Sequence, residues 1–406
     1  MQIKPVLAAL RRHRLATLLI AMEIALACAV LCNACFLIAT RWAAMNQPSG
    51  VDESSLATIQ LDAYEDRDAI DLNARLLAGL RAIPGVQSVT LLNSIPFGRH
   101  RGTAGIETRH DGVGTGDSPL VELYLGGPGS FDALGLRVVQ GRKLNDDDYQ
   151  PFNGLMPAHA SVLVTRSLAE RIWPGDNPLG KLIWLDESRY EVVGVMDQLV
   201  VPDPNGRGRG KEGWSVFVPG QSSTYLASSY LIKADPKDIA RVERDAREAA
   251  GKLAPDAVLD QPSSRTISDL RQDYFHQDRV MTGVLIGVVL ALLLVTVLGI
   301  VGLASFWVQQ RRKQIGIRRA IGATRADILG YFQTENFLIV SLGIGMGMVL
   351  AFALNLLLMH YYEVPRLPWA YLPVGALVLW SLGQLAVLGP ALRASQVPPV
   401  VATRSV

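Results

Sequence analysis

Net charge is almost absent from this sequence: 39 lysines and arginines stand against 37 acidic residues among 406, a formal net charge of +2. Without an excess of positive charge in its polar stretches, the chain has no electrostatic basis for binding nucleic acid, and we expect no such partner. Cysteine is also scarce, and Cys28, Cys32 and Cys35 lie at helical spacing in one apolar stretch. That stretch offers only Glu23 as a further ligand, so we interpret the cysteines as packing residues and predict no metal site.

Catalytic motifs are missing as well. The sequence contains no H-E-x-x-H and no G-x-S-x-G, so we predict no catalytic, cofactor-binding or metal-binding residues and a chain that is not itself an enzyme. A G-x-x-x-x-G-K pattern does occur at Gly175–Lys181, but Leu182 follows where a phosphate loop needs Ser or Thr, and Pro178 removes a backbone N–H. The pattern also follows an expected helix, whereas a phosphate loop precedes one, so we interpret it as a turn.

Long apolar runs, in contrast, are plentiful, since 49% of the residues are hydrophobic. Four stretches have the roughly 20 apolar residues that crossing a bilayer requires. The first has about 25, more than the hydrophobic region of a signal peptide, so we expect an uncleaved anchor. The predicted transmembrane helices 1 to 4 are residues 15–40, 280–308, 335–359 and 371–392.

Basic residues orient these four helices. The short connection at 360–370 balances Arg366 with Glu363, whereas three other segments carry most of the positive charge near the membrane. By the positive-inside rule, these three segments are cytoplasmic, so both termini are cytoplasmic and residues 41–279 lie outside. The three basic segments are residues 1–14, 309–334 and 393–406.

The external region has the alternation of a mixed α/β domain. Two stretches predict β-α-β units, and between them lies an insertion at about 121–223 with short strand candidates. In the first unit, Ile70, Ala74, Leu77 and Leu80 are expected to share the buried helix face. The polar stretches 99–118 and 202–213 are expected to be solvated loops or partner contacts. The expected strand–helix–strand segments are 55–61, 68–82 and 86–92, and then 228–234, 236–253 and 257–259.

The predicted fold class is therefore an α-helical membrane protein with four transmembrane helices and a large mixed α/β extracytoplasmic domain inserted between helices 1 and 2. Two polar residues lie inside helix 1, where such groups face protein or water. Glu23 is either a functional group or a buried hydrogen-bonded one, and Asn33 is interpreted as a contact between helices. The glycine pairs Gly283-x-x-x-Gly287 and Gly343-x-x-x-Gly347 permit close helix packing.

The stretch Gln309–Leu329, QQRRKQIGIRRAIGATRADIL, is the most distinctive of the chain. Its spacing predicts a basic helix or helix pair with Arg311, Arg318 and Arg325 on one face. A less polar stripe contains Ile317, Ile321, Thr324 and Ile328. The residues alone leave open whether this segment rests on acidic lipid headgroups or docks a cytoplasmic partner.

This stretch resembles the signature of FtsX-type permeases of ABC transporters, particularly of the MacB type. The C-terminal PALRASQVPPVVATR (Pro390–Arg404) resembles that family's characteristic tail, although Gln314 stands where the family usually has Glu. We expect no ATPase domain fused at either end and the ATPase to be a separate chain. Three external stretches resemble sequence motifs typical of the family's periplasmic core and occur in the same order: Phe131–Asp148, Arg166–Lys181 and Tyr190–Leu199.

The resemblance implies a permease subunit in a bacterial inner membrane that pairs with a second copy or a homologous permease. A cytoplasmic ATPase, which alone would bind ATP and Mg²⁺, would dock on the coupling segment 309–334 and drive the periplasmic domain to export or extract a substrate. The alternative is a scaffold that moves no substrate and transmits ATPase motion to a periplasmic cell-wall hydrolase. An adaptor and an outer-membrane channel would be further partners. The residues expected to contact the ATPase are Arg311, Gly316, Ile317, Arg318, Arg319, Ile321, Gly322, Thr324 and Arg325.

Overall fold

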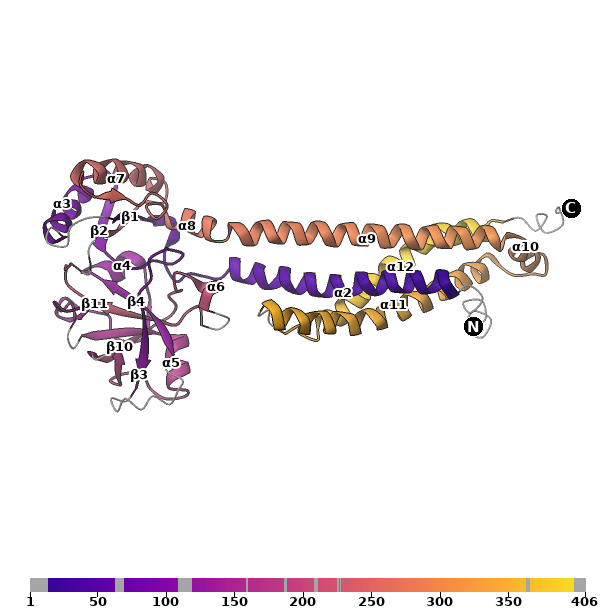
Figure 1. Ribbon diagram of the computed structural model, residues 1–406, viewed down its shortest axis with the longest axis horizontal. Coiled ribbons are helices and arrows are strands. Elements are labelled where there is room, and N and C mark those ends of the chain that lie inside the picture. The colour runs from indigo at the N-terminus through magenta and orange to yellow at the C-terminus, as the bar shows by residue number, and fades with distance from the viewer. Residues whose placement is uncertain are drawn as a thin grey trace. The chain divides into compact units, whose positions relative to one another are not determined.

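The computed structural model describes residues 14–62, 69–108, 119–157, 160–185, 188–207, 211–224, 226, 228–362 and 366–397. The chain forms two compact units. The helix unit comprises the chain up to Met45 and from Gln277 onward, and the α/β unit comprises Asn46–His276 (Figure 1). The α/β unit is thus inserted after the first long helix, as expected.

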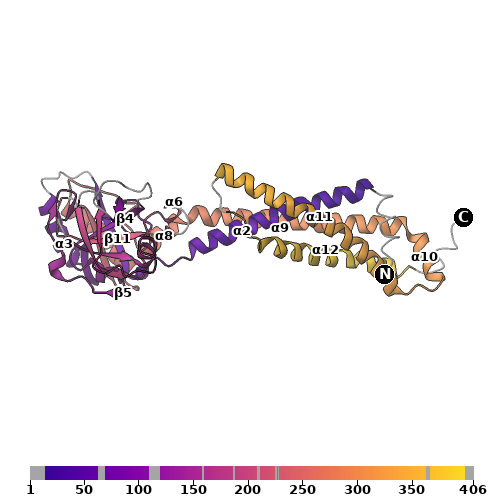
Figure 2. The ribbon, with the colours of Figure 1, turned by 90° about the horizontal axis from the view of Figure 1, so that it is seen from below.

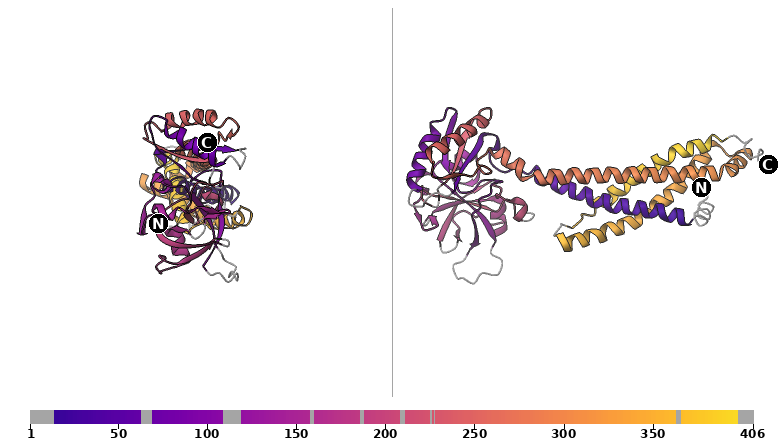
Figure 3. Two further views of the ribbon diagram at one scale, coloured as in Figure 1. Left: turned by 90° about the vertical axis from the view of Figure 1, so that its left-hand side faces the viewer. Right: turned by 45° about the horizontal axis from the view of Figure 1, so that its top comes forward.

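In the described part of the helix unit, four helices are long and apolar enough to cross a membrane, which confirms the predicted number. Figure 3 shows the second of these as a single unbroken helix. A short helix, α10 (Arg312–Ala320), lies between the second and third. The four long helices are α2 (Arg14–Met45), α9 (His276–Gln310), α11 (Arg325–Tyr362) and α12 (Tyr371–Ser395).

Helix α11 crosses α2 at close range, because glycines remove the side chains that would separate them (Figure 2). A Cβ atom on Gly343 would lie 2.7 Å from Cβ of Ile24, and one on Gly347 would lie 2.5 Å from Cβ of Cys28. This glycine pair therefore serves packing within the chain. Cys28 and Cys32 are buried among the helices, whereas Cys35 is exposed, so the expected packing face includes two of the three cysteines.

One part of the α/β unit is a four-stranded antiparallel sheet in the order β13-β1-β12-β2, built from the two ends of the unit's sequence. Two helices lie side by side on one face of this sheet (Figure 1). The order and the two crossovers are those of a ferredoxin-like fold, so the two predicted β-α-β units are present and interleave in one sheet. The elements are β1 (Leu56–Asp62), α3 (Ala69–Arg81), β2 (Val86–Leu91), β12 (Ser229–Ala234), α7 (Ile239–Leu253) and β13 (Val258–Leu259).

The buried face of α3 differs from the predicted one. Leu72, Leu76 and Leu80 face the core, whereas Ile70 is 60% exposed. Asn73 is buried beside the leucines, where its side chain accepts a hydrogen bond from the Tyr230 hydroxyl at 2.8 Å. A polar residue is thus part of the buried face, since it has an internal hydrogen-bond partner.

The inserted part is a closed barrel of mixed strands. The strand order is β5-β10-β8-β11-β4-β3-β9, and β9 also pairs with β10, which closes six of the strands into a ring. The first strand of the barrel, β3, lies before residue 121, where the insertion was predicted to start. It also lies within the stretch 99–118, so the expectation of a loop is wrong for these strand residues. Residues 109–118 lie outside the described residues. The strands are β3 (Thr103–Glu107), β4 (Leu120–Gly126), β5 (Val138–Gly141), β8 (Ser161–Thr165), β9 (Leu182–Leu185), β10 (Ser188–Met196) and β11 (Ser215–Pro219).

Short elements connect the strands. One of them, the 3-10 turn η3 (Asp146–Asp148), is closed by a capping box in which Asn145 and Asp148 bond each other's backbone N–H. Asp148 also pairs with Arg142 at 2.6 Å, and this guanidinium lowers the pKa of Asp148 to about 2. The other short elements are η1 (Glu53–Ser55), α4 (Ser130–Leu134), β6 (Phe152–Asn153), β7 (Met156–Pro157), α5 (Arg166–Ile172), α6 (Pro204–Arg207) and α8 (Ile267–Tyr274).

Candidate coupling site

The chain between α9 and α11 folds as a short helix followed by a tight turn. Gly322 has a φ of 102°, a conformation that glycine adopts without strain, and it ends the helical path that begins at Arg312. Thr324 then caps α11: its N–H donates to the Asp327 carboxylate at 2.9 Å, and its hydroxyl accepts from the Asp327 N–H at 3.2 Å. The stretch is therefore a helix pair, one of the two predicted forms.

The predicted single face of Arg311, Arg318 and Arg325 does not exist. Arg311 stands at the junction before α10, Arg318 lies within α10, and Arg325 begins α11 beyond the turn at Gly322. The seven-residue spacing predicts one face only along a continuous helix, and the turn interrupts it.

Arg311 points into the helix unit. Its Nη1 donates to both carboxylate oxygens of Glu335 on α11, at 3.0 and 2.9 Å, and the two side chains are 12% and 2% exposed. The guanidinium also lies over the Trp307 ring, 5.5 Å from its centre, so the end of α9 is fixed to α11 by an ion pair and an aromatic contact.

Arg319 joins α10 to the end of α12. Its Nη1 donates to the backbone oxygens of Ser395 and Val397 at 3.1 and 2.8 Å, which satisfies carbonyls that the helix end leaves unpaired. Arg318 lies over the Tyr331 ring at 5.0 Å. Beneath these cations, a buried apolar cluster connects α10, α11 and α12; its members include Ile315, Ile328, Phe332, Ala391 and Ala394.

The outward side of the segment has a different composition. Ile317 and Ile321 are 47% and 81% exposed, although both are large apolar residues. Arg312, Lys313 and Arg325 are exposed as well. We call these five residues the outward face: two apolar side chains accompanied by cations, in a segment whose other side is fixed to the helix unit.

The predicted contact residues thus divide into two groups. Ile317, Ile321 and Arg325 lie on the outward face, and Gly322 and Thr324 are exposed in the turn. The remaining four face or contact the chain itself: Arg311, Gly316, Arg318 and Arg319. Glu335 is not among the predicted residues, although an acidic residue at the start of a predicted membrane helix is a signal that a cation partner exists.

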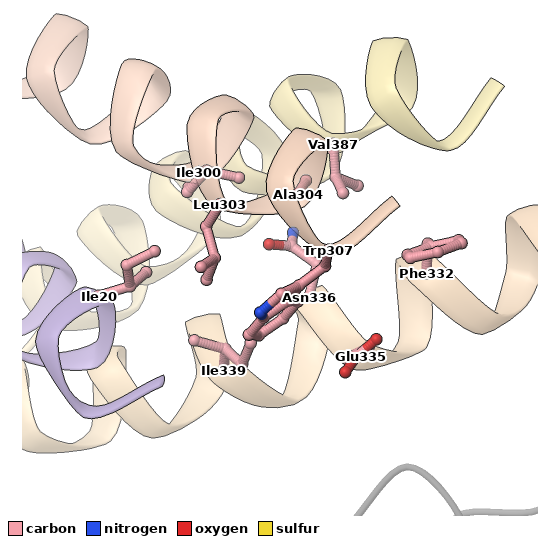
Figure 4. Close-up of a pocket in the computed structure, with 10 residues that line it drawn as sticks. All are labelled: Ile20, Ile300, Leu303, Ala304, Trp307, Phe332, Glu335, Asn336, Ile339 and Val387. Atoms are coloured by element: carbon pink, nitrogen blue, oxygen red, sulfur yellow. The ribbon is translucent and has the colours of Figure 1, made fainter. Parts of the chain in front are cut away.

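A small pocket adjoins the Arg311–Glu335 pair. Figure 4 shows the Trp307 ring extending from α9 toward Ile339 on α11, with Glu335 and Asn336 nearby. The pocket has about 20 Å³ of space for water-sized molecules, which suits one water. Ligand sites for drug-sized molecules have roughly 300 Å³ or more, so this space is too small for a drug-sized molecule.

The two polar residues of the first helix have different surroundings. The Asn33 amide donates to the Ala351 oxygen of α11 at 3.0 Å, which is the interhelical contact expected of it. The Glu23 carboxylate lies against Gly299 of α9, where a Cβ would be 2.7 Å from Oε2. Among the described residues, no hydrogen-bond partner of the buried Glu23 Oε1 is found. Glu23 therefore occupies a place on α9 that only a glycine leaves open.

The G-x-x-x-x-G-K pattern is a turn, as interpreted. Gly175 and Gly180 have φ values of 78° and 76°, and the pattern follows α5. The Lys181 ammonium lies 3.1 Å from the Asp176 carboxylate and 5.4 Å from the centre of the Trp173 ring, so its charge is used locally. Among the described residues, no cluster of three or more metal-ligating side chains occurs.

Comparison with known proteins gives two domain matches. Residues 20–249, more than half of the chain, match the MacB-like periplasmic core domain, and residues 286–399 match the FtsX-like permease C-terminal domain. The chain is 25% identical over 288 residues to the uncharacterized ABC transporter permease YvrN of Bacillus subtilis (strain 168), and the match covers 68% of each chain.

The chain is also 24% identical over 259 residues to the macrolide export ATP-binding/permease protein MacB of Bdellovibrio bacteriovorus, covering 60% of this chain and 38% of that one. It therefore spans well under half of that relative. The solved periplasmic region of MacB from Actinobacillus actinomycetemcomitans matches with a TM-score of 0.35 at 18% identity, covering 55% of this chain and 94% of that one. The family assignment is based on the two domain matches.

Proposed function

Since the chain belongs to the family of ABC transporter permeases with a MacB-like periplasmic core and an FtsX-like permease domain, we propose that it couples a separate cytoplasmic ATPase to movement of its α/β unit. The movement would export or extract a substrate. In this proposal the chain is a membrane-embedded permease subunit without enzymatic activity of its own, and ATP with Mg²⁺ would bind in the ATPase chain.

The observation that supports this proposal is the outward face. Ile317 and Ile321 expose apolar surface beside cations, a composition that suits a protein groove with an apolar floor and an acidic rim. The opposite side of the segment is held by Arg311 and Arg319, so a force applied to the outward face would reach α9, α11 and α12 directly.

The orientation is part of the same proposal. The positive-inside rule favours the outward face and both termini on the cytoplasmic side, with the α/β unit in the periplasm. In this arrangement the ATPase and the α/β unit are on opposite sides of the bilayer, and the long helices α2 and α9 connect them. A second permease chain would complete a dimer, as the family resemblance implies.

Affinity purification of the full chain, co-expressed with candidate ATPases of the same organism, tests the proposal. Ile317→Asp and Ile321→Asp place a charge in the apolar part of the outward face and should reduce recovery of the ATPase at least tenfold. Ile70→Asp is the matched control, because Ile70 is also an exposed isoleucine but lies in the α/β unit. Equal recovery with all four chains would reject the outward face as the docking site.

A second measurement separates export from the scaffold alternative. A deletion strain is complemented either with the wild-type chain or with Ile317→Asp. If the chain exports a substrate, cells with the variant should accumulate that substrate. Unchanged accumulation together with altered cell-wall turnover would favour the scaffold that regulates a periplasmic hydrolase.

A further inference from the structure

Two chain segments connect the α/β unit to the membrane helices. Residues 46–55 follow α2 and lead into β1, and α8 (Ile267–Tyr274) precedes α9. Any force that the helices apply to the α/β unit through the backbone passes through these two connections. How firmly the two connections are joined to each other therefore decides what kind of motion they deliver.

Arg271 of α8 bonds the incoming segment at two points. Its Nη2 donates to the Gln47 backbone oxygen and its Nη1 to the Glu53 carboxylate, each at 2.5 Å. The Ser268 hydroxyl of the same helix donates to the Glu53 backbone oxygen at 3.1 Å. The Arg271 and Glu53 side chains are 20% and 19% exposed, so this ion pair is better shielded from water than one on an open surface.

Aromatic rings hold the guanidinium in this position. Arg271 lies over the rings of Phe97 and Phe275, at 5.0 and 5.8 Å from their centres, and both phenylalanines are buried. Phe97 has a φ of 63°, a conformation that side-chain-bearing residues rarely adopt and that persists where the surroundings enforce it. The adjacent Tyr274 donates its hydroxyl to Asp203 at 2.6 Å, which fixes the end of α8 to another loop of the unit.

The helix unit has an ion pair of its own between the end of α2 and the start of α9. Arg41, near the end of α2, forms an ion pair with Asp278, near the start of α9. Each unit therefore fastens the outgoing chain to the returning chain by an arginine–carboxylate pair. Two linkers without such a contact would still transmit a pull. Their free backbone torsions would absorb rotation and shear, so these movements would not reach the α/β unit.

We propose that Arg271 is a positioning residue that locks the two connections together, so that helix displacement reaches the α/β unit as one rigid movement. This inference rests on the proposed function for its purpose, because it needs a force to transmit. The lock itself exists in the resting chain and can be measured without the ATPase.

The test uses the full chain in lipid nanodiscs with two spin labels. Alanine replaces the three native cysteines, and labels are attached to cysteines introduced at Asp256 in the α/β unit and Trp369 in the helix unit, both exposed. Labelled chain is diluted with unlabelled chain, and the width of the distance distribution between the labels is measured by double electron–electron resonance. Arg271→Gln should at least double this width, and Arg271→Lys, which retains the charge, should give an intermediate value.

The matched control is Arg265→Gln. Arg265 precedes α8 and pairs with Asp273 of that helix, so its loss should leave the width unchanged. Glu53→Gln removes the contact from the other side and replaces Arg271→Gln if that variant does not fold. A wild-type width in Arg271→Gln, or in Glu53→Gln where it is the substitute, would overturn the inference.

The outcomes also separate this inference from the proposed function. If no ATPase is recovered but Arg271→Gln broadens the distribution, the lock stands and the proposed function fails. If ATP with the recovered ATPase shifts the wild-type distance and shifts it equally in Arg271→Gln, the proposed function stands and the lock fails.

Discussion

Removing Arg311 should destabilise the helix unit more than removing its partner, Glu335. The carboxylate is almost completely buried, at 2% exposure, and Arg311 Nη1 lies within 3.0 Å of both of its oxygens. Two unit charges about 3 Å apart attract each other by about 5–6 kcal/mol at an effective dielectric constant of 20, and the lost hydration of both ions offsets most of this. The intact pair therefore adds little net stability, whereas a single buried charge is strongly destabilising.

We expect Arg311→Met to lower the free energy of unfolding by about 3–5 kcal/mol, because the Glu335 carboxylate stays buried without a counterion. Glu335→Leu should lower it by about 1–3 kcal/mol, since the long side chain of Arg311 is the more exposed of the two and can turn toward water. The double variant Arg311→Met/Glu335→Leu should lie within about 1 kcal/mol of the wild type.

The measurement is reversible unfolding of the full chain in mixed detergent micelles, analysed as a double-mutant cycle. Arg312→Met is the matched control, because Arg312 is the exposed neighbour in the same segment and its loss should be neutral. If the double variant loses as much stability as the two single variants together, Arg311 and Glu335 do not act as a buried pair.

Three further outcomes follow from contacts elsewhere in the chain. Gly347→Ala should destabilise the helix unit by about 1–3 kcal/mol because the new Cβ would overlap α2. Gly287→Ala is its control, since no described atom lies within 4 Å of that Cβ position. Equal losses of stability in the same unfolding assay would contradict a packing role of Gly347. The lowered pKa of Asp148 means that its ion pair with Arg142 stabilises the α/β unit fully above pH about 4 and that this stabilisation is lost as the pH falls through 2. Because Arg142 is half exposed, Asp148→Asn should lower the stability by only about 1 kcal/mol at pH 7, measured by hydrogen exchange, and by clearly less at pH 2. Lys181→Ala should leave ATP hydrolysis by the purified complex unchanged, and a lost activity would restore the nucleotide interpretation of that loop.

The ferredoxin-like sheet was predictable because its signals are local. Each of its strands and helices has its own periodicity, and turn residues such as Pro84-Gly85 separate them. The barrel was not predictable to the same degree. Its closure depends on β3 pairing with β9, residues about 80 positions apart, and no local pattern encodes which short strand pairs with which.

The prediction of the buried face of α3 failed for a different reason. The predicted stripe included the exposed Ile70. The buried face instead contains Leu72, Leu76 and Leu80, and Asn73 is buried beside them with a hydrogen bond from Tyr230, which lies on a strand far along the chain. Hydrophobic periodicity ranks residues by their transfer from water and contains no information on such internal partners.

The coupling segment shows why a cluster of arginines cannot be assigned to a partner from sequence alone. Positive charge next to a membrane helix suits acidic lipid, an acidic partner and an internal carboxylate equally well, and the choice depends on the turn at Gly322 and on Glu335 of another helix. The consequence reaches the experiments. An Arg311 variant that fails to bind an ATPase has lost the support of the segment as well as a charge, so its failure is no evidence of direct contact. Ile317→Asp changes only an exposed side chain, and a lost interaction there, in a chain whose unfolding free energy is unchanged, identifies the surface itself.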